Sequence, residues 1–259
     1  TVKKGSELDK MIQLFEEKSR NYTDIDFSKA RGNKKVLITG FDPFILNEFD
    51  NDYLRKVRAN PNILQSNPSG VVALALTNNN QLGAYVQTMV VPVRYTDFDD
   101  SQNNNVGQGE GIIEKYIKPL IHDVDMIITV SQYKPDENVI DMFGTATRGG
   151  FNDNQDFIRV EGSHALVTND EWIETTLPKE FTNAPFIKYN WEFNYVSNPT
   201  ETKPLPNQKL NQGSGGDYLS NEIFYRVAKI RKEMKPILKT GHFHISKIQE
   251  KNTDLDSKE

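Results

Sequence analysis

The chain has 259 residues, of which 36% are hydrophobic, and this is enough to bury the core of one α/β domain carrying insertions. Its net charge of −5 and its lack of a basic block argue against a nucleic-acid partner. No apolar run approaches the ~20 residues of a bilayer span, which argues against a membrane partner. Without any cysteine, the chain cannot form disulfides, thiolate metal sites or a thiol nucleophile.

Residues 1–34 are expected to form a helical extension ahead of this domain. Within them, residues 6–19 predict a helix, because apolar side chains recur at helical spacing on one face. That face consists of Leu8, Met11, Ile12 and Phe15. We expect the helix to pack on the outside of the domain as an accessory element.

The apolar run Lys35–Thr39 predicts a buried first strand that leads into the loop Gly40–Phe44. A loop at the carboxyl end of a strand is a usual binding site in an open α/β sheet. Phe41 and Phe44 could wall a small flat pocket there, although aromatic side chains beside a core strand usually belong to the core.

Further helices and strands alternate along the chain, as expected of a largely parallel sheet covered on both faces. The predicted helices are 67–76, opened by Asn67-Pro-Ser69, and 111–122, and the predicted strands are 85–93 and 124–130. A short helix over 171–178 and a half-exposed strand over 187–196 follow. Residues 45–65 and 183–210 are interpreted as insertions, and 247–259 as a polar tail.

The glycine-rich stretch 211–219 leads into an amphipathic helix that ends before Pro236. Ser220 lies at the junction, where free amides and the helix dipole stabilise an anion. A serine in this place is also a common helix cap. The strand predicted over 239–246 carries His244, which could reach back to Ser220 as a base. By themselves, Gln132, Asp141 and Arg148 are typical of a surface loop after a strand.

Six motifs together, in order along the chain, resemble the pyroglutamyl peptidases, which remove an N-terminal pyroglutamate. These motifs are Val36–Phe44, Asn67–Ser69, Pro92-Val93, Ile127–Gln132, Thr175–Pro178 and Gly216–Asn221. The resemblance implies a single α/β/α sandwich over 35–246 with a twisted, mostly parallel mixed sheet. No internal repeat, Walker loop or zinc spacing is present, so neither metal nor cofactor is expected.

By this resemblance, the family's catalytic cysteine, histidine and glutamate correspond to Ser220, His244 and Asp141. The resemblance also implies residues around the substrate, with two rings flanking the lactam and with polar groups that orient the triad and polarise the carbonyl. These residues are Phe41, Phe44, Gln132, Arg148, Tyr218 and Leu219. The implied partner is a peptide with a blocked, pyroglutamyl N-terminus.

The departures from the family concern the chemistry directly. A thiol can react as a thiolate, whereas Ser220 needs a base to remove its proton, and Asp141 is one methylene shorter than glutamate. Ile45 and Leu46 replace two glycines of the family. We therefore expect little or no turnover, with a non-catalytic peptide-binding or interaction protein on the same fold as the alternative.

Ser220 is either a natural residue or an introduced replacement, and the cysteine-free, altered chain favours a natural, diverged homologue. The resemblance implies a cytoplasmic protein, while the absence of an initial methionine leaves export open. Homo-oligomerisation is equally open at this point.

Overall fold

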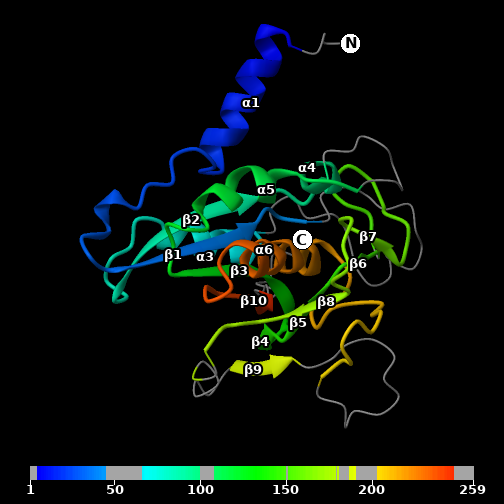
Figure 1. The fold of residues 1–259 in the computed structure, drawn as a ribbon. Helices are drawn as coiled ribbons and strands as arrows, with labels where there is room; N and C mark the ends of the chain where they lie inside the picture. Colours follow the sequence, from blue (N-terminus) through cyan, green and yellow to red (C-terminus); the bar gives the residue numbers. More distant parts are fainter. Residues whose placement is uncertain are drawn as a thin grey trace, which may run out of the picture.

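The computed structural model describes residues 5–44, 66–99, 108–149, 151–178, 180, 187–190 and 203–247. Its centre is a six-stranded sheet (Figure 1) in which β2, β1, β3 and β10 run parallel, β4 is antiparallel to β10, and β9 is parallel to β4. In sheet order the strands are β2 (Ala84–Val91), β1 (Lys34–Phe41), β3 (Met126–Pro135), β10 (Lys239–Lys247), β4 (Asn138–Asp141) and β9 (Ile187–Asn190). The mostly parallel mixed sheet expected from the sequence is confirmed.

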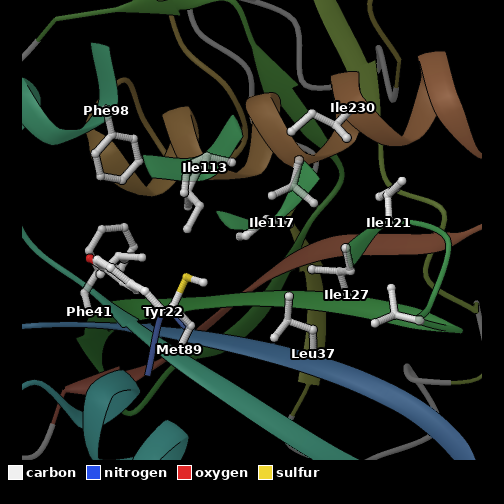
Figure 2. Close-up of a cluster of buried hydrophobic side chains, with 14 of the residues drawn as sticks. Tyr22, Leu37, Phe41, Met89, Phe98, Ile113, Ile117, Ile121, Ile127 and Ile230 are labelled. Carbon is white, nitrogen blue, oxygen red and sulfur yellow. The ribbon is translucent and has the colours of Figure 1, made fainter. Parts of the chain in front are cut away.

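Helices cover both faces of this sheet. On one face, side chains of β1 and β3 pack beneath α5 (Ile112–Tyr116) and α6 (Leu219–Met234) in the largest apolar cluster of the described residues (Figure 2). On the other face, Ile38 and neighbouring residues pack with Leu76 of α3 (Pro68–Leu76). Successive residues such as Leu37 and Ile38 therefore serve opposite layers, as strand geometry requires.

The junction of β1 with α3 is fixed by the Asn67-Pro68-Ser69 motif. The Asn67 side chain caps the helix by accepting from the Ser69 amide at 3.1 Å, and Pro68 occupies the first helical turn. The Ser69 hydroxyl accepts from the Phe41 amide at 3.0 Å. A Cβ on Gly40 would lie 2.2 Å from the Ser69 carbonyl oxygen, so only glycine permits this close approach.

Two predicted helices differ from the observed elements. Residues 172–174 form strand β8 (Trp172–Glu174), paired antiparallel with β5 (Phe143–Thr145), and Thr176 then bonds the backbone of β10, so the predicted helix over 171–178 is wrong. The helix predicted over 111–122 is shortened to α5 and a 3-10 turn, η2 (Lys118–Leu120), because Pro119 lacks the amide that would continue it.

Several short elements complete the described part of the fold. They are η1 (Ser28–Ala30), α4 (Tyr95–Asp99), and the antiparallel pair β6 (Thr147–Arg148) and β7 (Ser163–His164). The insertion 45–65 and much of 183–210 lie outside the described residues, as does the predicted tail 247–259 except for Lys247, which ends β10. Within the described part, no helix is long and apolar enough to cross a membrane.

The N-terminal helix α1 (Glu7–Ser19) forms as predicted but does not pack as predicted. It begins with a capping box between Ser6 and Asp9 and projects from the layered body (Figure 1). None of its 13 residues is buried, and its apolar face is exposed. The expectation that this face covers the domain is therefore wrong.

Candidate active site

Ser220 is the second residue of α6, directly after the glycine-rich loop. A tight turn precedes the helix: the Gly213 amide donates to the Gly216 carbonyl at 2.8 Å, and Gly216 has a positive φ of 97°. Tyr218 is the N-cap, and its side chain makes no capping hydrogen bond to the first turn. Ser220 therefore lies beside free amides at the positive end of a 16-residue helix, half-buried.

Asn221 anchors the first turn of α6 to the neighbouring backbone. Its amide nitrogen donates to the carbonyls of Thr145 at 3.0 Å and Thr147 at 3.1 Å, while its oxygen accepts from the Thr145 amide at 2.9 Å. The side chain is buried, so these hydrogen bonds compete little with water. The start of the helix, and with it Ser220, is held rigidly.

His244 and Asp141 form a buried pair on adjacent strands. Nδ1 of His244 on β10 lies 2.8 Å from Oδ2 of Asp141 on β4, and both side chains are almost fully excluded from solvent. Neither oxygen of Asp141 nor Nδ1 of His244 has another hydrogen-bond partner among the described residues. This arrangement lets a carboxylate orient an imidazole so that its other nitrogen can act as a base.

Gly215 connects this pair to Ser220. A Cβ at Gly215 would lie 2.2 Å from Oδ2 of Asp141 and 2.4 Å from Cε1 of His244, so the loop backbone is pressed against both side chains. The Ser220 hydroxyl donates to the Gly215 carbonyl in a long hydrogen bond of 3.5 Å. The three residues thus converge on Gly215, but no hydrogen bond joins Ser220 to His244 in the described structure.

A second histidine, His242, lies beside the pair and was not singled out from the sequence. Its Nδ1 lies 2.8 Å from the Thr129 hydroxyl and its Nε2 lies 2.7 Å from the Ser131 hydroxyl. Its ring meets that of His244 edge to face, with centroids 4.5 Å apart. Burial, reinforced by His244, lowers the pKa of His242 well below its ordinary value. The His-Phe-His alternation at 242–244 was the signal that both histidines share one face of β10.

Asp141, His242 and His244 are also the group of described residues that could hold a metal ion, since their ligand atoms lie within 4.8 Å of one another. However, both nitrogens of His242 contact hydroxyl groups, and Nδ1 of His244 faces Asp141. A metal ion would have to displace these contacts. The geometry therefore fits an oriented base better than a metal centre.

Three of the residues expected around the substrate lie elsewhere. Phe41 is only 3% exposed and stacks on Phe98 inside the core cluster (Figure 2). Leu219 is buried in the same cluster. Gln132 pairs with Ile245, which faces α3, so strand alternation places Gln132 on the face opposite His244. These placements argue against substrate contacts by Phe41 and Leu219 and against a contact of Gln132 with His244.

The remaining two aromatic residues expected around the substrate are partly exposed to solvent. Phe44 is half-buried and packs against the edge of the core cluster. Tyr218 is half-buried as well, and its hydroxyl donates to the Asn152 carbonyl at 3.0 Å. The ring of Tyr218 also packs edge to face against Tyr95 and Phe151, so each of the two rings contacts the protein and keeps only part of its surface beside the loops that the sequence associates with a ligand.

Arg148 belongs to a buried ion network that the sequence analysis missed. Its Nη1 lies 3.0 Å from Asp99 and 3.2 Å from Glu222, the residue two positions after Ser220. Glu222 in turn pairs with Arg226 at 2.8 Å, the i,i+4 spacing that was the sequence signal. Charged side chains buried in this way require nearby opposite charges to compensate for the loss of water. Nε and Nη2 of Arg148 have no partner among the described residues.

Comparisons by sequence identify a family for this chain. A family model described as "PA0049, C-terminal domain" matches residues 35–179, more than half of the chain. An uncharacterized protein of Pseudomonas aeruginosa, PA0049, is 24% identical over 326 aligned positions, covering 89% of this chain and 57% of that protein. The chain thus spans little more than half the length of this relative.

Solved structures of pyroglutamyl peptidases resemble the chain in fold. Pyroglutamyl peptidase I from Bacillus amyloliquefaciens matches with a TM-score of 0.56 and 18% identity, covering 84% of this chain and 82% of that structure. A mutant pyrrolidone carboxyl peptidase from Pyrococcus furiosus matches with a TM-score of 0.53 and 18% identity, covering 82% and 80%. The chain therefore belongs to the PA0049 C-terminal domain family and shares its α/β fold with the pyroglutamyl peptidases.

Proposed function

We propose that the protein binds peptides with a pyroglutamyl N-terminus at the site of Ser220, His244 and Asp141, and that it hydrolyses them slowly or not at all. The observation that carries the proposal is the buried contact of 2.8 Å between His244 and Asp141, pressed against the loop that delivers Ser220. A carboxylate, an imidazole and a hydroxyl gathered at a helix N-terminus are the parts of an acyl-transfer site.

In this proposal each residue has a defined task. Ser220 attacks the scissile carbonyl, His244 takes the hydroxyl proton, and Asp141 orients the imidazole. Free amides in the first turn of α6 stabilise the oxyanion. Phe44 and Tyr218 provide aromatic surface for the lactam ring, and Arg148 has two donors, Nε and Nη2, that have no partner in the described part of the chain and could polarise a carbonyl.

Weak turnover follows from the nucleophile. A free thiol has a pKa near 8.5, which a helix N-terminus and a histidine can bring down towards neutrality, whereas a serine hydroxyl must lose its proton in concert with attack. Here the Ser220 hydroxyl donates to the Gly215 carbonyl, so it must rotate before His244 can accept its proton. A misplacement of ~1 Å at a nucleophile can cost about a hundredfold in rate.

The alternative is a binding protein without turnover on the same fold. The same hydrogen bond favours it, because it occupies the Ser220 hydroxyl with a backbone acceptor in place of the catalytic base. Both functions share one recognition site, so binding and hydrolysis must be measured separately.

The test combines calorimetric binding of a pyroglutamyl peptide with hydrolysis of a fluorogenic pyroglutamyl substrate. Wild type should bind the peptide but not the same peptide beginning with proline. Ser220→Cys should increase turnover by at least tenfold, while Ser220→Ala sets the blank. Ser28→Cys, which places a thiol at an exposed remote position, should match wild type and thereby control for adventitious thiol reactivity.

The possible outcomes distinguish a slow enzyme, a binding protein without turnover and a protein that does not recognise pyroglutamate. Binding by wild type without turnover in Ser220→Cys would favour the binding protein over the enzyme. Absence of specific binding by both wild type and Ser220→Cys would overturn the pyroglutamyl assignment. A robust wild-type rate that vanishes in Ser220→Ala would instead establish a serine peptidase and contradict the expected weak turnover.

A further inference from the structure

Helix α1 is attached to the domain through its polar side. Glu17 accepts a hydrogen bond from the Tyr116 hydroxyl at 2.8 Å, and Glu16 pairs with Arg20 and with Arg94, the latter at 3.3 Å. Just beyond the helix, Tyr22 stacks on Tyr116 with ring centroids 4.6 Å apart. These contacts fix the last turn and leave the first turns projecting from the body (Figure 1).

This attachment turns the apolar stripe of α1 outward. A surface helix normally buries its apolar side, yet here the acidic side faces the domain. Met11 is 63% exposed and Phe15 is 71% exposed, and Leu8 and Ile12 are exposed by half. The stripe follows the i, i+3, i+4, i+7 spacing of a helix that packs on another helix. A 13-residue helix with no buried residue is marginal in water, so a covering partner would stabilise it.

We propose that this stripe, defined as Leu8, Met11, Ile12 and Phe15, is a dimer interface covered by the same stripe of a second copy in antiparallel orientation. In that arrangement the stripe is self-complementary about its centre, as a two-fold interface requires. Leu8 meets Phe15 of the second copy, and Met11 meets Ile12 of the second copy.

Charges beside the stripe support an antiparallel copy over a membrane. At 100° per residue, Glu7 and Lys18 fall on the same flank of the stripe, near opposite ends of the helix. An antiparallel copy therefore brings Lys18 of each chain, which already pairs with the exposed Asp24 of its own chain, near Glu7 of the other. The acidic residues on the opposite flank are already engaged, Asp9 in the capping box and Glu16 with two arginines. With four acidic and two basic residues, α1 is unsuited to an anionic lipid surface.

The size of the contact indicates a weak dimer. A helix of 13 residues is about 20 Å long. Two such helices cover less than the roughly 1,200 Å² of total area that a standard interface begins with. We therefore expect an equilibrium between monomer and dimer that dissociates on dilution and does not depend on peptide binding at the proposed active site.

The first test is sedimentation across micromolar to near-millimolar concentrations. The mass of the wild type should rise from the 29.6 kDa monomer towards twice that value. Phe15→Glu and Met11→Glu should remain monomeric with an unchanged midpoint of thermal unfolding measured at low concentration. Leu82→Glu alters an equally exposed apolar residue, 63% accessible, outside α1, and should dimerise like wild type. A wild type that stays monomeric throughout, or a dimer that survives Phe15→Glu, would overturn the proposal.

The second test uses the absence of native cysteine to fix the orientation. Met11→Cys lies next to the two-fold axis and should form a disulfide with its own copy under mild oxidation. Phe15→Cys should not, because seven residues separate it from the position facing it, about 10 Å along the axis. Phe15→Cys mixed with Leu8→Cys should cross-link. Efficient self-linking of Phe15→Cys would show a parallel pair and refute the antiparallel arrangement.

Discussion

Replacing His242 should make the stability of the fold less sensitive to acid. His242 is fully buried with hydroxyl groups on both ring nitrogens, and its pKa in the folded protein lies well below the ordinary 6.5. The titratable groups that face it are His244 on the same strand and Asp141 on β4. His242→Gln keeps a polar side chain toward Thr129 and Ser131 but removes the titrating ring.

The sign and size follow from proton linkage. Below pH 6.5 the unfolded chain binds a proton at this histidine and the folded chain does not, so the free energy of unfolding falls as the pH falls. Each pH unit below 6.5 costs about 1.4 kcal/mol while the folded ring stays neutral. Integrating this dependence from about pH 7.5 to about pH 5 gives the total effect. Over that range, His242 alone should lower the free energy of unfolding by about 2 kcal/mol.

The measurement is denaturant unfolding at several pH values between these limits. His242→Gln will lower stability near neutral pH, but the loss on acidification should be smaller than in wild type by about 2 kcal/mol. His122→Gln, at an exposed position, should retain the full wild-type slope. Parallel pH profiles for wild type and His242→Gln would show that the buried ring takes up a proton in the folded state and would refute the reasoning.

Three further substitutions probe the frame of the site, each measured by denaturant unfolding at neutral pH. Gly215→Ala should cost about 1–3 kcal/mol and abolish peptide binding, because the added methyl group would lie 2.2 Å from Asp141; an unchanged protein would contradict the close packing. Arg226→Met should cost about 3–5 kcal/mol, because Glu114 and Glu222 both lose a buried cation and Glu222 keeps only Arg148 among the described residues; adding Glu222→Gln should recover part of this loss. Asn221→Ala should cost about 2 kcal/mol through unsatisfied backbone groups, and a neutral result would show that water replaces its contacts.

The order and type of the central strands and helices could be predicted from the sequence. In these segments the local pattern of apolar and turn-forming residues favours the same structure that the surrounding layers require. The apolar run Lys35–Thr39 is a strand buried on both faces, which needs no alternation to be recognised. The glycine-rich loop, the helical spacing after it and Pro236 together define α6 almost to the residue. The family resemblance then implied that Ser220, His244 and Asp141 belong to one site, and the structure shows His244 and Asp141 in contact.

Only the tertiary structure decided where the remaining side chains point. Residues 172–174 are a strand because β5 and β10 offer them backbone partners, which local helical spacing could not reveal. Phe41 is buried inside the core cluster, whereas Phe44 is half-buried at its edge, because the burial of each ring depends on which layer covers it. The apolar stripe of α1 faces outward because contacts of Glu16 and Glu17, made with residues distant in sequence, fix the orientation of the helix. Periodicity shows that a helix has two unlike faces, but contacts between distant residues determine which face is buried.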